Sequence, residues 1–198
     1  MTSPRSAVSG WRAETVAGTL FLVVGPSGAG KDTLLHGASK ALAGDNRYVF
    51  PRRTITRPAD AGGEEHDAVD VVGFEAAKRQ GAFALSWRAH DQAYGIPVAI
   101  NDLLAQDRHV VINVSRTVLD EARDRFDRVG IIRIDVPREA LASRLAQRGR
   151  EDQAAITGRL ERAHAHRVSG DDVTVLVNDG TVEDAVQRLV SLLRDAEW

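Results

Sequence analysis

Apolar residues in this chain alternate between continuous runs and helix-spaced segments. Four runs are rich in β-branched residues and nearly free of polar ones, as strands buried on both faces of a parallel sheet are; they span residues 19–24, 110–114, 129–134 and 173–177. Between them, apolar residues recur at helical spacing in residues 33–42, 116–126, 137–147, 152–167 and 181–195. This order predicts a three-layer α/β fold, in which helices cover both faces of a mostly parallel central sheet through right-handed crossovers.

Two segments interrupt this alternation. Residues 47–96 are rich in glycine, charge and short strand signals, and this irregular pattern predicts an inserted substrate-binding lobe. Residues 148–155 form a polar link between two helices that carry arginines, which predicts a short mobile lid. The remaining pattern fits one domain over residues 19–198, and residues 1–18 are expected to form a flexible tail.

The loop after the first apolar run has the strongest chemical signature. It matches the G-x-x-x-x-G-K pattern of phosphate-binding loops and stands between a predicted strand and a predicted helix. Its glycines allow backbone N–H groups to turn toward phosphate oxygens, and the helix N-terminus adds a favourable dipole. We predict a P-loop that binds ATP, with an ordinary glycine-rich turn as the alternative. Its residues are Gly25, Pro26, Ser27, Gly28, Ala29, Gly30 and Lys31, and the lysine is expected to reach the β- and γ-phosphates.

The residue after the lysine departs from the usual P-loop pattern. A P-loop places Ser or Thr there, whose hydroxyl holds Mg²⁺, but this chain has Asp32, followed by Thr33. A carboxylate is a good ligand for a hard cation, although it also brings negative charge close to phosphate. We expect Mg²⁺ to accompany ATP and to be held either by Asp32, directly or through a water molecule, or by Thr33.

Three arginines flank the predicted lid. Arg144 and Arg148 lie four residues apart and therefore share a helix face, and Arg159 follows eleven residues later. Phosphoryl transfer concentrates charge on the equatorial oxygens of the moving group, and arginines brought in by lid closure can stabilise that charge. We predict catalytic roles for these arginines together with Lys31. Solvent-exposed arginines paired with nearby carboxylates are the alternative.

An arginine-rich segment early in the predicted lobe is a candidate acceptor site. In an extended conformation Arg53, Ile55 and Arg57 share one face, which suits a substrate that carries one or two phosphates. A basic, solvated edge strand is the alternative. The acidic cluster 64–67, which contains His66, could bind sugar hydroxyls or form a charged surface loop.

Two further residues extend this candidate site. Tyr94 could donate a hydrogen bond to a substrate phosphate. Asn113 ends a buried strand, near the place where a second phosphate or Mg²⁺ contact is expected. No residue stands out as a general base, which favours a phosphate acceptor. Such an acceptor is already anionic at neutral pH, so transfer needs positioning and charge neutralisation rather than proton abstraction.

Composition narrows the possible partners. A net charge of −2 argues against a protein that grips a nucleic-acid backbone, so we expect no nucleic-acid partner. The absence of cysteine excludes disulfides and thiolate metal sites and suits a cytoplasmic location. No stretch approaches the length of a membrane span, so we expect no membrane partner. The sequence leaves the oligomeric state open.

From the P-loop to about residue 193, the chain resembles the guanylate kinase-like group of P-loop kinases. The motifs that carry the resemblance lie at residues 25–31, 55–58, 94–95, 144–149 and 156–160, in the order and spacing of that group. The resemblance implies a P-loop kinase fold and phosphate-stabilising roles for Lys31, Arg144, Arg148 and Arg159. It also implies acceptor-phosphate contacts for Arg57 and Tyr94, and it places Asn178 at the adenine pocket of the ATP site.

The chain departs from guanylate kinases at the acceptor site. Asp60 stands where those enzymes carry a second acceptor arginine, and Ser86 stands where they use a glutamate to read guanine. Asn113 and Ser115 occupy positions that are aspartates in those enzymes. Because buried guanine donors without a partner are costly, GMP is a poor candidate for the acceptor.

At these variant positions the chain resembles the ribose 1,5-bisphosphate phosphokinases, a related family from bacterial phosphonate catabolism. The shared motifs lie at residues 30–32, 55–66, 84–87, 111–116, 148–151 and 178–180. The resemblance implies transfer of the ATP γ-phosphoryl group to ribose 1,5-bisphosphate, a sugar phosphate, giving 5-phosphoribosyl 1-diphosphate and ADP. Arg53, His66 and Asn113 are candidates for selecting the sugar. A nucleoside monophosphate kinase and a non-catalytic guanylate kinase-like binding module are the alternatives.

Overall fold

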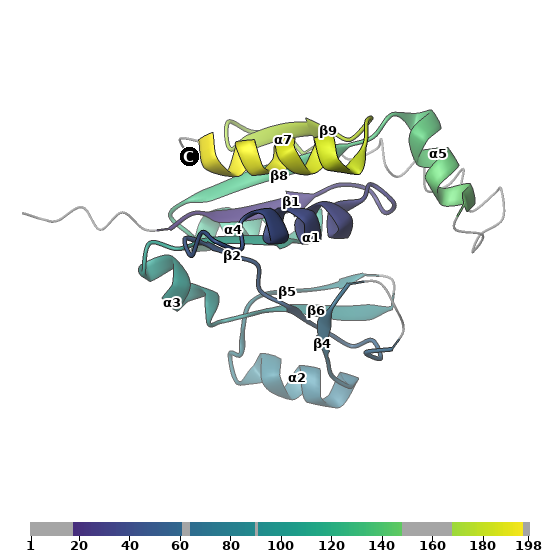
Figure 1. Ribbon diagram of the computed structural model, residues 1–198. Coiled ribbons are helices and arrows are strands. Elements are labelled where there is room, and N and C mark those ends of the chain that lie inside the picture. The colour runs from purple at the N-terminus through teal and green to yellow at the C-terminus, as the bar shows by residue number, and fades with distance from the viewer. Residues whose placement is uncertain (1–17, 61–63, 90, 148–167, 196–198) are drawn as a thin grey trace, which may run out of the picture.

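A five-stranded parallel sheet forms the centre of the protein in the computed structural model, which describes residues 18–60, 64–89, 91–147 and 168–195 (Figure 1). The strands lie in the order β2-β7-β1-β8-β9, and every neighbouring pair is parallel. Their bounds are Leu20–Val24 (β1), Tyr48–Val49 (β2), His109–Asn113 (β7), Val129–Asp135 (β8) and Val173–Val177 (β9). The carboxyl ends of the strands therefore share one edge, which is where open α/β sheets bind ligands.

Strand β1 is buried on both faces because helices cover the two sides of the sheet. The covering elements are α1 (Lys31–Ala41), α3 (Ile100–Ala105), the 3₁₀ turn η1 (Arg116–Val118), α4 (Leu119–Arg125) and α7 (Val182–Asp195). Phe21 and Val23 share one core with α1 and α7, whereas Leu20, Leu22 and Val24 share the other core with α3 and α4. Alternate residues of one apolar strand thus hold the two outer layers, as the period of a strand requires.

A smaller mixed sheet is inserted between β2 and α3, and we call residues 50–97 the lobe. Its strands lie in the order β4-β3-β6-β5, with only β3 and β4 parallel. The bounds are Arg53–Ile55 (β3), His66–Ala68 (β4), Val71–Arg79 (α2), Phe83–Ala89 (β5) and Gln92–Pro97 (β6). Phe74 of α2 stacks on Phe83 at a ring-centroid distance of 4.7 Å. Leu85 and Ile96 belong to the same core as Leu20, so the lobe packs onto the central sheet.

The predicted α/β fold class is confirmed, and β1, β7, β8 and β9 match the four predicted strands. Helix α5 (Arg138–Gln147) follows β8 as expected and stands beyond the carboxyl edge of the sheet (Figure 1). Thr181 begins α7 as its N-cap, because its hydroxyl accepts a hydrogen bond from the Asp184 N–H at 3.1 Å. No helix in the described part of the chain is both long enough and apolar enough to cross a membrane.

Helices α2 and α3 were not predicted, and the short strand signals at residues 47–96 did not give the bounds of β2 to β6. The lobe was expected to begin at about residue 47, and β2 at residues 48–49 pairs with β7 in the central sheet instead. Gly18, the last residue of the expected tail, is ordered by a hydrogen bond from its N–H to the Leu104 carbonyl. The rest of the tail, the lid at residues 148–155 and the helix at residues 152–167 lie outside the described residues.

Helices α1 and α7 approach each other closely at Gly37. A Cβ atom at this position would lie 2.4 Å from Cγ2 of Val186 on α7. Val186 is buried and β-branched, so its side chain has few other rotamers into which it can move. Glycine at this position therefore allows the two helices to pack, although glycine is a poor helix former.

We expect Gly37→Ala to lower the free energy of unfolding by about 1 kcal/mol, because overpacking outweighs the gain in helix propensity. Gly44→Ala is the matched control, since a Cβ atom there has no neighbour within 4 Å, and it should be close to neutral. Urea unfolding of both variants measures the difference. A Gly37→Ala protein at least as stable as the wild type would contradict this account of the helix contact.

Candidate active site

The glycine loop after β1 has the local structure of a P-loop. Gly30 begins α1 with a φ of 88°, a left-handed conformation that favours glycine. The loop is braced by Asn178, which directly follows the edge strand β9 and whose side-chain amide donates to the Ala29 carbonyl at 2.8 Å. The Asn178 N–H also donates to the Asp135 carbonyl at 2.7 Å, which ties the ends of β8 and β9 together. Asn178 therefore positions the loop, and its contact with adenine stays a prediction.

Lys31 lies partly buried at the base of this loop. Its ammonium group donates to the carbonyl oxygens of Gly25 at 2.9 Å and Pro26 at 3.0 Å. Burial lowers the pKa of Lys31 to about 8, and the nearby guanidinium of Arg53 lowers this pKa further while the Asp32 carboxylate opposes the shift. The lysine is therefore positively charged at pH 7 but close to its titration point.

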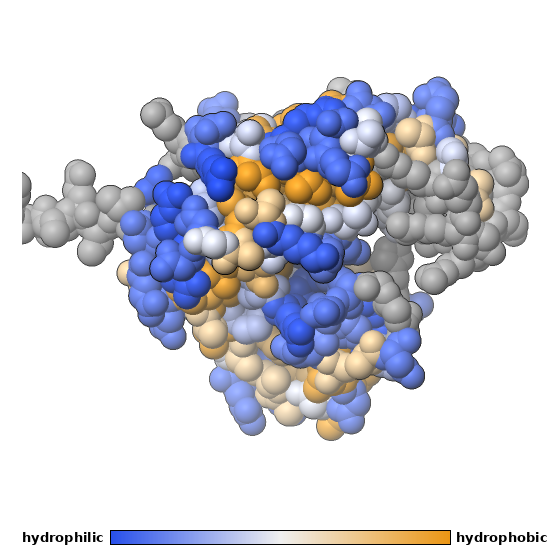
Figure 2. Space-filling model, in the orientation of Figure 1, coloured by the Kyte–Doolittle hydropathy of each residue, from blue (hydrophilic) through white to orange (hydrophobic). Residues whose placement is uncertain are grey.

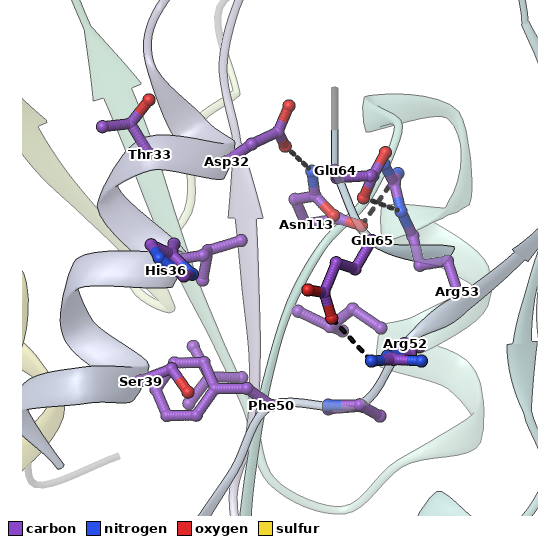
Figure 3. Close-up of a pocket in the computed structure, with 14 residues that line it drawn as sticks. Asp32, Thr33, His36, Ser39, Phe50, Arg52, Arg53, Glu64, Glu65 and Asn113 are labelled. Carbon is purple, nitrogen blue, oxygen red and sulfur yellow. Dashed lines mark hydrogen bonds and ion pairs between the residues drawn. The ribbon is translucent and has the colours of Figure 1, made fainter. Parts of the chain in front are cut away.

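Asp32 and Asn113 are joined by a hydrogen bond between α1 and the end of β7. The Asn113 side-chain amide donates to a carboxylate oxygen of Asp32 at 2.6 Å (Figure 3). Asn113 is buried, whereas Asp32 is exposed in the first turn of the helix. Thr33 is also exposed, and it projects away from Asn113 (Figure 3). The two candidate metal ligands thus differ in how firmly they are held, because only the Asp32 side chain is fixed by the hydrogen bond from Asn113.

A cavity of about 620 Å³ separates α1 from the lobe. In Figure 2 the surface is hollowed between the central part of the molecule and the lobe, and hydrophilic side chains line the hollow. The polar lining residues come from α1, the end of β7, the start of β3 with the residue before it, and the segment before β4; they are Asp32, Thr33, His36, Ser39, Arg52, Arg53, Glu64, Glu65 and Asn113. The cavity therefore begins beside the P-loop and ends at the lobe.

Arg53 connects the lobe to the central sheet. Its guanidinium forms an ion pair with Glu64 and donates to the Asn113 carbonyl at 3.3 Å. The same group lies 5.1 Å from the ring centre of Tyr94 and 5.8 Å from that of Trp87, and the two rings stack on each other 5.2 Å apart. Arg53 is only 8% exposed, so its charge is compensated inside the protein.

Arg57 and His66 lie side by side in the lobe. The His66 ring nitrogens lie 3.0 Å from the carbonyl oxygens of Arg57 and Glu64, so this histidine holds two loop segments together. The Arg57 guanidinium contacts the His66 ring at 3.4 Å. Its Nε is buried and has no hydrogen-bond partner among the described residues. A buried guanidinium N–H without an acceptor is well suited to meet an incoming anion.

Two of the five predicted acceptor residues, Arg53 and Asn113, line the cavity. The other three, Arg57, His66 and Tyr94, lie outside its lining, and their substrate contacts stay predictions. His36 and Ser39 line the cavity but were not predicted. Their positions four and seven residues after Asp32 place all three on one face of α1, and this spacing could have identified them from the sequence.

Of the three predicted catalytic arginines, one belongs to a described helix. Arg144 lies in α5, and its side chain is outside the described part of the structure, as are Arg148 and Arg159. Within the described residues, no group of three or more His, Cys, Asp or Glu side chains could hold a metal ion by itself.

A P-loop at the edge of a parallel sheet, facing an inserted lobe with arginines, defines a phosphotransferase of the P-loop kinase class. The chain belongs to the guanylate kinase family, which it matches over residues 17–196. A crystal structure of guanylate kinase from Anaplasma phagocytophilum has the same fold, with a TM-score of 0.62 at 19% identity, covering 91% of this chain and 86% of that one.

Within this family the chain is similar to proteins named ribose 1,5-bisphosphate phosphokinase. It is 48% identical over 177 residues to the one from Methylobacterium radiotolerans, a match that covers 89% of this chain and 98% of the relative. It is 44% identical over 178 residues to the one from Agrobacterium fabrum, covering 89% of this chain and 97% of the relative. The resemblance found in the sequence is thereby confirmed.

The pKa of about 8 at Lys31 predicts how nucleotide binding depends on pH. Phosphate binds the ammonium form, so binding raises the pKa and takes up a proton above pH 8. We expect the affinity for a non-hydrolysable ATP analogue to fall about tenfold between pH 7 and pH 9.

Calorimetric titration measures this dependence, with Lys31→Arg as the comparison. A guanidinium stays charged throughout this range, so the arginine variant should show a flatter profile whatever its absolute affinity. Equal pH slopes for the two proteins would contradict the assignment of this titration to Lys31.

Proposed function

We propose that this protein transfers the γ-phosphoryl group of ATP to ribose 1,5-bisphosphate. The 1-phosphate accepts the group, and the products are 5-phosphoribosyl 1-diphosphate and ADP. The observation that carries this proposal is the cavity, which brings two arginine–glutamate pairs of the lobe opposite the first turn of the P-loop helix. The names of the relatives in the same family support the choice of acceptor.

The donor side of the reaction rests on the P-loop. Backbone N–H groups at the start of α1 and the ammonium of Lys31 would bind the β- and γ-phosphates of ATP. Mg²⁺ commonly binds through one or two carboxylates together with substrate phosphates, and the exposed carboxylate of Asp32 fits such a site. Bound Mg²⁺ supplies charge neutralisation on the phosphate oxygens.

The acceptor side needs ligands for two phosphates and for sugar hydroxyls. Arg57, with its buried and unpartnered Nε, would bind one phosphate. Arg52 and Arg53 in the cavity wall provide further positive charge, and their partners Glu65 and Glu64 are hydrogen-bond acceptors for ribose hydroxyls. The lobe thus carries both kinds of ligand that a sugar bisphosphate requires.

Transfer itself requires little acid–base chemistry. An oxygen of the 1-phosphate forms a bond to the γ-phosphorus while the bond between that phosphorus and the bridging oxygen of ADP breaks. The attacking oxygen is already anionic, so no proton must be removed from it. Lys31 would stabilise the charge that develops on the moving group, and Arg144, Arg148 and Arg159 are proposed to do the same.

Phosphorylation of GMP is the second candidate function, because the chain belongs to the guanylate kinase family. Ser86, at the position where the resemblance expects a guanine-reading glutamate, lies in β5 and pairs with Gly95 of β6. A hydroxyl at this position is neutral and short, so it matches the two guanine donors less well than a carboxylate does. Ribose 1,5-bisphosphate is therefore the preferred acceptor.

A substrate panel tests this choice. We expect ADP release with ribose 1,5-bisphosphate and none above background with GMP, and phosphorus NMR should detect a diphosphate ester as the product. Lys31→Ala should lower turnover more than about a hundredfold while the thermal unfolding curve stays cooperative. Turnover with GMP alone would overturn the proposal, unchanged turnover in Lys31→Ala would exclude Lys31 from catalysis, and no turnover with either acceptor would favour a non-catalytic binding module.

Arg57→Ala tests the acceptor-phosphate site. We expect the KM for ribose 1,5-bisphosphate to rise about ten- to a hundredfold, because a charged hydrogen bond to phosphate is lost, while the affinity for ATP is unchanged. Arg88→Ala is the matched control, since Arg88 lies in the same lobe but pairs with Glu75 at the surface. Steady-state kinetics with each substrate varied in turn distinguishes these outcomes. Equal KM values in the two variants would exclude Arg57 from the acceptor site.

A further inference from the structure

The contact between Asp32 and Asn113 reverses an arrangement that is general among P-loop enzymes. In P-loop nucleotide hydrolases, Mg²⁺ is held by a hydroxyl residue directly after the P-loop lysine and by an aspartate at the end of a neighbouring strand. In this chain the residue after Lys31 is the carboxylate, and the residue at the end of β7 is the amide. The two positions are bonded to each other at 2.6 Å.

We propose that Asp32 and Asn113 together position the metal ion, with the carboxylate and the neutral side chain exchanged between the two positions relative to the general arrangement. Asp32, rather than Thr33, contacts the Mg²⁺ that accompanies ATP, and Asn113 is a positioning residue that holds the Asp32 carboxylate. This inference rests on the proposed ATP-dependent reaction, but it concerns only the nucleotide side of the site. It also gives Asn113 a role other than the contact with sugar expected from the sequence.

The chemistry of the two side chains sets the direction of the bond. A carboxylate can only accept, so the Asn113 amide must present its NH₂ group to Asp32. This bond uses one lone pair of the carboxylate and leaves the others available for a cation. Asn113 is itself anchored, because it is buried and its carbonyl accepts from Arg53 at 3.3 Å. The donor is therefore rigid, and it fixes an exposed side chain on the helix.

The pair also explains why Asn stands at position 113. An aspartate there would place a second carboxylate within hydrogen-bond distance of Asp32, and like charges this close disfavour ionisation of one of them. A carboxylate on α1 therefore requires a neutral donor at the end of β7. The two departures from the general pattern are thus physically coupled.

Nucleotide affinity with and without metal tests the role of Asp32. In Asp32→Asn the affinity for an ATP analogue with Mg²⁺ should fall about ten- to a hundredfold, whereas without metal it should stay the same or rise, because a negative charge near phosphate is removed. Competition by Mn²⁺, followed by electron paramagnetic resonance, reports metal binding directly. Asp102→Asn, which changes an exposed aspartate in the first turn of α3, is the matched control. A loss confined to Thr33→Val, or equal losses with and without metal in Asp32→Asn, would overturn the proposal.

A double-mutant cycle tests the exchange itself. We expect Asp32→Ser and Asn113→Asp each to weaken metal-dependent nucleotide binding. The double variant restores the general arrangement, so its nucleotide affinity should be at least about tenfold higher than the sum of the two single losses predicts. Additive losses would overturn the pairing. These measurements need no acceptor, so a failure here is distinct from a failure of the proposed function, which the substrate panel detects.

Discussion

The buried ion pair between Arg53 and Glu64 is the interaction on which the relation between the lobe and the P-loop depends. Arg53 is almost completely buried, and a buried charge that loses its partner costs several kcal/mol. The same guanidinium bonds the carbonyl of Asn113, and the side chain of Asn113 bonds Asp32. A continuous series of contacts therefore runs from the lobe through the end of β7 to the first turn of α1. The two walls of the cavity are held facing each other by this series.

The charges in this series also act on Lys31. Arg53 lowers the pKa of the lysine, whereas Asp32 and Glu64 raise it, and burial outweighs all of them. Glu64 therefore has two effects, because it neutralises Arg53 and helps to keep the ammonium form of Lys31. Because the pKa of Lys31 is about 8, the lysine is already charged at pH 7, and the arrival of phosphate raises its protonated fraction mainly above pH 8. The acceptor wall and the donor loop are thus linked through electrostatics as well as through contacts.

Local patterns were sufficient to predict the P-loop and most of the central sheet, because β1 is a continuous apolar run followed directly by the glycine motif. Strand β2 has only two residues, too few to show a period, and it exists because β7 pairs with it. Asn178 and Ala29 are 149 residues apart, and Asn113 and Asp32 are 81 apart, so no local pattern reveals these contacts. The sequence therefore supplied candidate residues for the site, and the fold shows which of them are in contact with one another.

The arginine–glutamate pairs in the cavity wall determine which hydrogen-bonding groups the cavity offers to an acceptor. Glu64 takes its hydrogen bonds from Arg53, but a carboxylate can accept about four, so capacity remains for hydroxyl groups. Trp87 and Tyr94 stack on each other and against Arg53, so this aromatic surface is used within the lobe. The proposed sugar bisphosphate would present hydroxyls in the middle and phosphates at its ends to such a site. Arg52 and Arg53 of this wall are each paired with a glutamate, so the wall presents fixed pairs of opposite charges rather than an excess of positive charge.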